Sequence, residues 1–127
     1  MNADKTHLLR LGTQERLGRT GQLTVHMDNL QLESSPDNCE LLLGVEIQAN
    51  LKWNFQVRKL IGKLRSRLVG LNCLKLIVSY DTRIAITIGM FNSVLVYCLP
   101  FFGGCNKCDI QDLQVLQNKA AQLVTHK

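Results

Sequence analysis

The stretch from Trp53 to Leu71 reads WNFQVRKLIGKLRSRLVGL, and its apolar residues recur every three or four positions. That spacing places the apolar side chains on one side of an α-helix and the polar ones on the other. The apolar stripe consists of Trp53, Val57, Leu60, Ile61, Leu64, Leu68 and Leu71. Such a helix is stable when its apolar side packs against other elements, so the segment predicts the centre of a helical domain.

The polar side of this helix is basic. Between Lys52 and Lys75 there is no acidic residue, and the basic side chains are Lys52, Arg58, Lys59, Lys63, Arg65, Arg67 and Lys75. Four of them can share the surface opposite the apolar stripe, namely Arg58, Lys59, Lys63 and Arg67. Ordinary solvated helix surfaces mix both signs, because like charges one turn apart destabilise a helix. We therefore predict a surface that binds the phosphate backbone of nucleic acid. A merely solvated surface and a membrane-binding surface are the alternatives.

The charges are divided unevenly between the two halves of the chain. Residues 1–50 carry four basic and seven acidic side chains, whereas residues 51–127 carry eleven basic and three acidic ones, which gives the net charge of +5. A polyanionic partner is therefore expected to meet the second half. The basic helix is accompanied by no zinc-finger spacing and no aromatic-rich strand that could stack bases, so we expect recognition of backbone and shape.

Two further helices are predicted after the basic one. The first would be capped by Asp81 and run to about Leu99, where Pro100 stops it, although its β-branched residues leave a strand open as an alternative. The second would be capped by Asp109. The uncharged stretch from 84 to 106 is long enough to cross a bilayer, but its polar residues, proline and glycines favour a buried core helix. Three helices with short connections predict a small bundle.

The first half reads as short strands. His7–Leu11 is one apolar run, and Leu23–Met27 and Leu30–Leu32 alternate around a turn as a hairpin does. Leu41–Ile47 reads as one buried strand in which Gly44 marks a bulge or a close backbone approach. The expected fold class is therefore α+β, with an antiparallel β region over residues 1–50 and a three-helix bundle over residues 51–127.

No self-sufficient chemical site is visible. The odd number of five cysteines and the absence of an apolar signal core after Met1 favour reduced thiols in an intracellular protein, cytoplasmic or nuclear. Cys105 and Cys108 have CxxC spacing, but no second pair stands at zinc-ligand spacing, so no metal site is expected. The ten carboxylates include no Asp-Asp pair and no Asp-x-Asp, whereas two-metal phosphoryl transfer needs paired carboxylates.

Five segments are informative when taken together. They are Asn2-Ala3-Asp4-Lys5-Thr6, Leu42-Leu43-Gly44-Val45, Leu51-Lys52-Trp53, the region from Ser93 to Gly104, and Leu113 to Ala121. In the same order they resemble segments of non-LTR (LINE-type) retrotransposon reverse transcriptases, jockey-like elements being the closest type. The family segments are the Asn-x-x-Lys-Thr element after the catalytic aspartates, the Tyr-Leu-Gly-Val primer grip, the Leu-x-Trp that opens the thumb, the Ser-x-x-x-Tyr-x-x-Pro-x-Trp-Gly-Gly region, and a Leu-Gln-x-x-Gln-Asn-Lys-Ala-Ala-Arg stretch.

The resemblance implies a role for each region. The full-length relative would be an RNA-directed DNA polymerase that copies an RNA template from a nicked DNA primer with magnesium. Lys5 would lie near the incoming nucleotide as an acid for the leaving pyrophosphate, and Leu43 and Gly44 would support the primer terminus. Residues 1–50 would form the palm edge with a primer-grip-like strand, and residues 51–127 the thumb, whose basic helix holds the template–primer duplex.

The departures from the family concern polar and aromatic positions. Leu42 replaces the aromatic residue of the grip, Gln56 a histidine, Phe102 a tryptophan and Gln122 an arginine. The family's aspartate-bearing palm motif would lie upstream of Asn2, so the palm and fingers would be partners of this fragment. We expect a truncated reverse transcriptase fragment that binds RNA, DNA or their hybrid, has no cofactor of its own, and is inactive alone. The alternative is a repurposed protein-interaction module that uses the apolar helix over residues 84–102.

Overall fold

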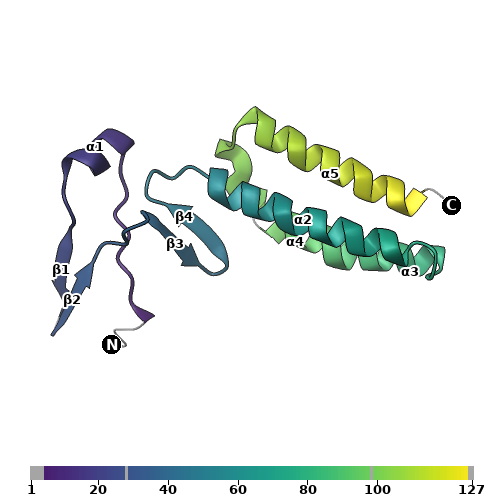
Figure 1. The fold of residues 1–127 in the computed structure, drawn as a ribbon, viewed down its shortest axis with the longest axis horizontal. Coiled ribbons are helices and arrows are strands. Elements are labelled where there is room, and N and C mark those ends of the chain that lie inside the picture. Colours follow the sequence, from purple (N-terminus) through teal and green to yellow (C-terminus); the bar gives the residue numbers. More distant parts are fainter. Residues whose placement is uncertain (1–4, 28, 98, 126–127) are drawn as a thin grey trace. The chain divides into compact units, whose positions relative to one another are not determined.

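The structure, a computed structural model, describes residues 5–27, 29–97 and 99–125, with the backbone alone at 101–103. The chain divides into two compact units, Met1–Phe55 and Gln56–Lys127 (Figure 1). The first unit contains two β-hairpins and a short helix, and the second contains helices. The α+β class expected from the sequence is therefore confirmed.

The first hairpin pairs β1 (Thr24–Met27) with β2 (Leu30–Glu33) in antiparallel register, with Thr24 opposite Glu33 and Met27 opposite Leu30. Alternate residues of β2 are half-buried and exposed, as expected for a strand with one side on the protein. The hairpin predicted from the alternation in this segment is confirmed.

The second hairpin pairs β3 (Cys39–Leu42) with β4 (Val45–Gln48), also antiparallel. Leu43 and Gly44 form the connection, with φ of +51° and +82°. Positive φ at both central residues is the conformation that matches the twist of a two-residue hairpin turn. The prediction of one strand over residues 41–47 is wrong: Gly44 is no bulge within a strand but reverses the chain.

The side chain of Arg10 connects the segments on either side of α1 (Gln14–Arg19). The Arg10 guanidinium donates hydrogen bonds to the carbonyl oxygens of Leu17 at 2.7 Å, Thr20 at 2.9 Å and Gly21 at 2.8 Å. The last carbonyls of a helix lack intrahelical partners and carry partial negative charge, so a cation is favourable there. Arg10 therefore holds the segment before α1 against the segment after it.

The predicted strand over residues 7–11 is reduced to one isolated bridge, between Leu8 and Ser34, in parallel orientation. Beyond it the Gly12 N–H donates to the Ala49 carbonyl at 2.9 Å, so the segment pairs with two different parts of the chain. The strand prediction is wrong because this segment passes between the hairpins and does not follow one edge.

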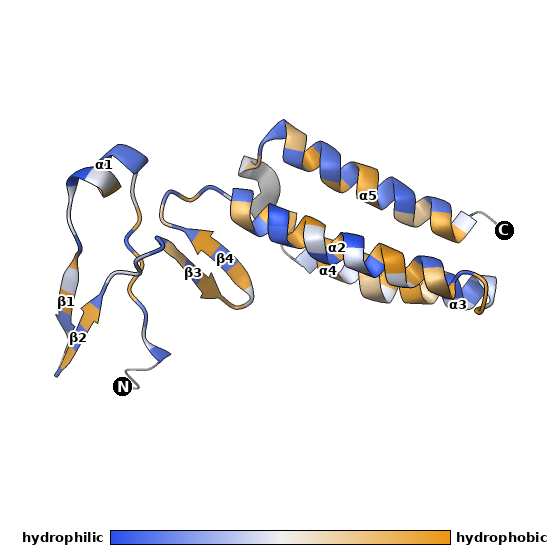
Figure 2. Cartoon of the chain, viewed as in Figure 1, coloured by the Kyte–Doolittle hydropathy of each residue, from blue (hydrophilic) through white to orange (hydrophobic). Residues whose placement is uncertain are grey.

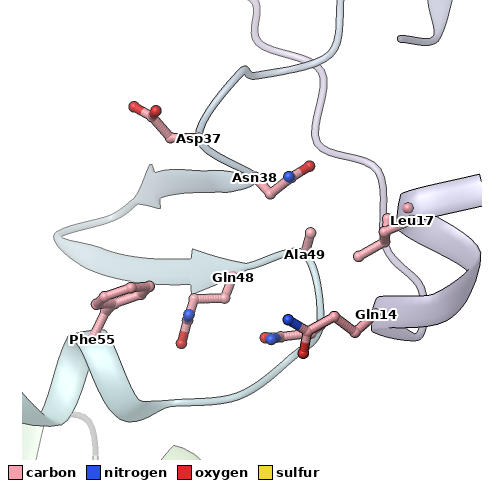
Figure 3. A pocket seen from close by; sticks show the side chains of 9 residues that line it. Gln14, Leu17, Asp37, Asn38, Gln48, Ala49 and Phe55 are labelled. Atoms are coloured by element: carbon pink, nitrogen blue, oxygen red, sulfur yellow. The ribbon is translucent and has the colours of Figure 1, made fainter. Parts of the chain in front are cut away.

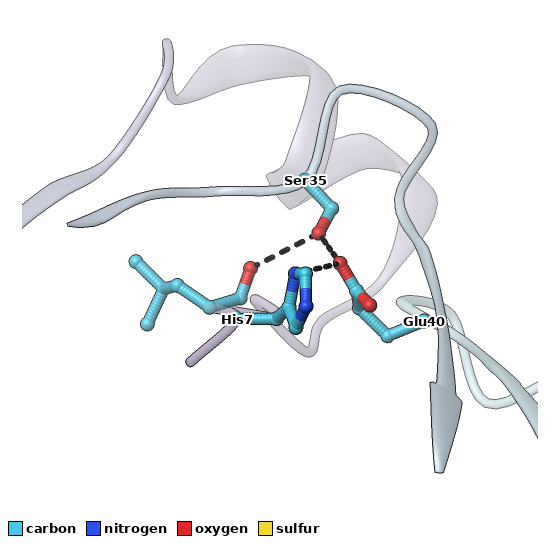
Figure 4. A network of polar contacts seen from close by, with 4 residues as sticks. His7, Ser35 and Glu40 are labelled. Carbon is cyan, nitrogen blue, oxygen red and sulfur yellow. Dashed lines mark hydrogen bonds and ion pairs between the residues drawn. The ribbon is translucent and has the colours of Figure 1, made fainter. Parts of the chain in front are cut away.

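A small polar network lies beside that bridge (Figure 4). The Ser35 hydroxyl contacts the Glu40 carboxylate and lies 3.5 Å from the Leu8 carbonyl oxygen. The His7 Nδ1 lies 3.6 Å from the same carboxylate, which forms an ion pair when the imidazole is protonated. The network links the start of the chain to β3 through side chains.

The second unit consists of three helical rods. Their elements are α2 (Asn54–Leu74), α3 (Tyr80–Thr87), the π-helical turn η2 (Ile88–Asn92), α4 (Ser93–Tyr97), the 3-10 segment η3 (Leu99–Gly104) and α5 (Lys107–Thr125). The middle rod, α3 to α4, runs antiparallel to α2 and α5 (Figure 1). The three-helix bundle predicted from the sequence is confirmed.

The core of this unit is built from the apolar stripe of each rod. Val57 and Leu64 of α2 and Phe91 of the middle rod are 0% exposed. Other buried apolar residues are Leu60, Ile61, Leu68, Leu71, Leu95, Leu113, Leu116 and Ala120. Along α2 and α5, apolar positions recur between polar ones (Figure 2), as a spacing of three and four residues requires in an amphipathic helix.

The two later helices begin earlier than predicted. Ser79 is the residue before α3, and its hydroxyl accepts a hydrogen bond from the Thr82 N–H at 3.4 Å. Asp81 therefore lies in the first turn and is not the cap. Likewise α5 begins at Lys107, so Asp109 lies in its first turn. Both carboxylates remain favourable there, because the helix N-terminus carries partial positive charge.

The middle rod contains one wider turn. Ser93 donates its backbone N–H to the Ile88 carbonyl, five residues back, so η2 holds one residue more than an α-helical turn. The rod nevertheless stays helical from Tyr80 to Tyr97, so the alternative of a strand here is wrong.

The uncharged stretch from 84 to 106 is only partly buried. Thr87, Phe91 and Leu95 face the core, whereas Ile88 and Val96 are more than half exposed. Of the helices in the described part of the chain, none combines the length and hydropathy needed to cross a membrane.

The turn of the second hairpin can be tested by substitution. Leucine rarely adopts the left-handed conformation that Leu43 has, whereas asparagine tolerates it and Asn-Gly is favoured in such turns. Leu43→Asn is expected to raise the free energy of unfolding by about 1 kcal/mol, measured by urea denaturation. Leu42→Asn, on the preceding exposed strand position, is the matched control and should not stabilise. Equal effects of the two changes would contradict the turn.

Candidate nucleic-acid interface

The buried side of α2 determines which residues it presents to solvent. Its buried residues are Gln56, Val57, Leu60, Ile61, Leu64, Leu68 and Leu71. The last six belong to the predicted stripe, whereas Trp53 precedes the helix and is half-buried, and Gln56 is buried in addition. Because the buried residues occupy one side of the helix along its whole length, the opposite side is left without packing partners from the bundle. The predicted basic residues can therefore be sorted by their position relative to this stripe.

Four of the seven predicted basic residues are exposed along α2: Arg58, Lys59, Lys63 and Arg65. At 3.6 residues per turn, Lys59 and Lys63 lie one turn apart on one flank of the exposed side, and Arg58 and Arg65 lie two turns apart on the other. The helix itself carries no acidic residue over its 21 positions. The exposed side of α2 thus presents two rows of positive charge, which we call the α2 basic rows.

Between the basic rows lies a line of residues with small side chains or none, which we call the low strip. Gly62, Ser66 and Gly70 follow the exposed side at intervals of four. A Cβ atom added at Gly62 or Gly70 would meet nothing within 4 Å apart from the adjacent backbone of the helix itself, so the space above the helix backbone is open there. A rod-shaped polyanion can therefore approach the backbone between the two rows. This strip is not among the residues predicted from the sequence, although its spacing of four is visible there.

The other three predicted basic residues lie elsewhere. Lys52 is exposed in the segment before α2. Arg67 is half-buried, and its guanidinium donates to the Met90 carbonyl in the π-helical turn. Lys75 follows the end of α2 and lines a groove between α2 and α5 together with Lys119. The structure therefore brings together four of the seven, and it assigns Arg67 to packing of the middle rod.

The residues singled out by the family resemblance belong to the first unit. Lys5 is exposed at the start of the described chain. Leu43 and Gly44 form the tip of the second hairpin, where Leu43 is 83% exposed. The tip is accessible, as a contact with a partner requires, and its backbone conformation is the left-handed one described above.

Basic side chains outnumber acidic ones in the helical unit. Residues 56–127 contain ten basic and three acidic side chains, a net of +7. The acidic ones are Asp81, Asp109 and Asp112, in the first turns of α3 and α5 or just beyond, where the helix N-terminus favours them. The field around α2 is therefore positive.

Cys105 lies just before α5 and is half-buried. Burial raises the pKa of the Cys105 thiol above its ordinary value, and the Asp109 carboxylate raises that pKa further. A raised pKa lowers the thiolate fraction, and the thiolate is the nucleophilic and metal-binding form. Within the described residues, no group of three or more His, Cys, Asp or Glu side chains is arranged to hold a metal ion.

We compared the chain with known protein families, proteins and structures. No protein-family model, no curated protein and no solved structure matches the chain. The resemblance to reverse transcriptases therefore rests on the five sequence segments alone.

Proposed function

We propose that the helical unit binds nucleic acid through the phosphate backbone, without catalysing a reaction on it. The observation that carries the proposal is the pair of basic rows on α2, separated by the low strip at Gly62 and Ser66. Lysine and arginine on such a surface neutralise phosphates and release condensed counterions. A backbone-binding surface of this kind has little base specificity.

The family resemblance gives this activity a context. In a reverse transcriptase of the non-LTR type, the segment after Trp53 would be the thumb, and its partner would be a template–primer duplex. We propose that the chain corresponds to the palm edge and thumb of such an enzyme. The polymerase reaction itself would need the paired aspartates that this sequence lacks.

The affinity for an RNA–DNA hybrid is expected to depend steeply on salt. If the four cations of the basic rows each contact one phosphate, the affinity should fall about a hundredfold between 50 and 200 mM salt. Gel-shift titrations at several salt concentrations measure the slope. A slope near zero would mean that no phosphates are neutralised, which contradicts the proposal.

Charge reversal on one row separates this surface from the general positive charge. Lys59→Glu/Lys63→Glu is expected to weaken hybrid binding by more than about tenfold and to reduce the salt slope by about two. Lys107→Glu/Lys119→Glu changes the net charge equally on α5, and it should have a smaller effect because neither side chain belongs to the α2 basic rows. Equal losses in the two variants would show that binding is not located on α2.

A second candidate function is protein interaction through the middle rod. Ile88, Val96 and Tyr97 of this rod are 55%, 58% and 65% exposed, and Leu99, at the start of η3, is 54% exposed, so the rod and the segment after it present apolar side chains to solvent. Exposed apolar patches are typical of protein-binding surfaces. The side chains of residues 101 to 103 lie outside the described residues.

Self-association tests this candidate. If the middle rod joins two copies, sedimentation velocity should show a concentration-dependent dimer, and Val96→Asp/Leu99→Asp should abolish it because both side chains would face the partner. Arg58→Ala, on α2, is the control and should leave the dimer unchanged. A monomer at all concentrations would contradict self-association through the middle rod.

A further inference from the structure

A polar pocket of about 340 Å³ lies in the first unit, beside the end of β4 (Figure 3). Volumes near 300 Å³ are at the lower end of those that bind small ligands. Its lining is rich in amides and includes one aromatic ring and one carboxylate: Gln14, Asn38, Gln48, Asn50, Phe55 and Asp37. All of these belong to one compact unit.

Gln48 gives the pocket an unsatisfied acceptor. The residue is only 9% exposed, and its Oε1 has no hydrogen-bond partner among the described residues. A buried amide oxygen without a donor is unfavourable, so a donor that reaches it is bound favourably. The terminal torsion of glutamine is soft, which allows the amide to turn its oxygen towards a ligand.

The backbone next to Gln48 is held in place. The Ala49 N–H donates to the Asn38 carbonyl at 2.7 Å, and the Ala49 carbonyl accepts from the Gly12 N–H at 2.9 Å. These two bonds connect the end of β4 to the turn before β3 and to the segment before α1. The backbone that carries Gln48 is therefore fixed beside the pocket by its neighbours within the same unit.

The other side chains that line the pocket indicate which kind of ligand it could bind. Phe55, in the first turn of α2, is 54% exposed and offers an aromatic ring to the pocket. Among the described residues, no lysine or arginine lines the pocket, and the Asp37 carboxylate points away from the other lining side chains (Figure 3). The lining therefore does not favour a phosphate group. It suits a flat, uncharged heteroaromatic ring that carries a hydrogen-bond donor.

We propose that this pocket binds an unpaired nucleobase with an exocyclic amino group, the ring against Phe55 and the amino group donating to Gln48 Oε1. The inference rests on the proposed function, since nucleic acid is the partner that would bring such a base. Unpaired bases are commonly bound by stacking on an aromatic side chain and by hydrogen bonds to their edges. The first unit would then add base recognition to a backbone contact made by α2.

Nucleosides test the pocket without any contribution from phosphate. Cytidine and uridine have the same shape but differ where cytidine has an amino donor and uridine a carbonyl acceptor. In ¹⁵N-detected titrations of the full chain, cytidine should shift the Gln48 side-chain amide and the Ala49 N–H, with a dissociation constant on the order of 1 mM. Uridine should bind at least about fivefold more weakly.

Two variants assign the contacts. Gln48→Leu removes the acceptor and should abolish the preference for cytidine over uridine, whereas Gln31→Leu on the exposed strand β2 is the matched control and should preserve it. Phe55→Ala should weaken binding of both nucleosides about tenfold. Circular dichroism and the unaffected amide resonances show whether each variant is folded.

The outcomes separate this inference from the proposed function. Failure of both nucleosides to saturate any shift, or equal affinity for the two, overturns the base pocket and leaves hybrid binding by α2 untouched. Cytidine binding that persists in Lys59→Glu/Lys63→Glu, while salt-sensitive hybrid binding is lost, supports both. Cytidine binding by a chain that never binds the hybrid supports the pocket and contradicts the α2 interface alone.

Discussion

Burial of the apolar side of α2 is the constraint on which the rest of the helical unit depends. Seven residues of this helix are buried, six of them apolar, and the middle rod and α5 contribute further buried apolar side chains to the core. Once that side is covered, the direction of every other α2 side chain follows from the helical period. The exposed cations are therefore held by core packing, because a rotation of α2 that moved them would expose Val57 and Leu64.

The helices and one hairpin could be predicted because their patterns are local and long. The period of three and four along α2 repeats over five turns, and the alternation on both sides of Asn29 is typical of a hairpin. The second hairpin could not be predicted, because a leucine at a left-handed turn position contradicts residue preferences and Leu41–Val45 contains no polar side chain that marks a turn. Ser79 was overlooked as a cap because Asp81, two residues later, is an equally good capping residue in sequence alone.

The candidate interface was partly predictable for the same reason. The absence of acids along α2 is visible in sequence, and it identified the exposed residues Lys59 and Lys63 correctly as members of one surface. Arg67 differs because it lies on the edge of the buried stripe, where a carbonyl of the π-helical turn accepts its guanidinium. That turn has no clear sequence pattern. The pocket at Gln48 was not predictable either, since it is formed by segments far apart in sequence.

The two hairpins have a consequence for how the first unit behaves towards other chains. Each sheet has only two strands in the described part of the chain, so every strand has one side whose N–H and C=O groups are not engaged in a ladder. Leu41 and Leu42 lie on such a strand and are 62% and 58% exposed. An extended segment from another molecule could extend either sheet by one strand with no rearrangement of the hairpin, and concentrated solutions would favour this growth.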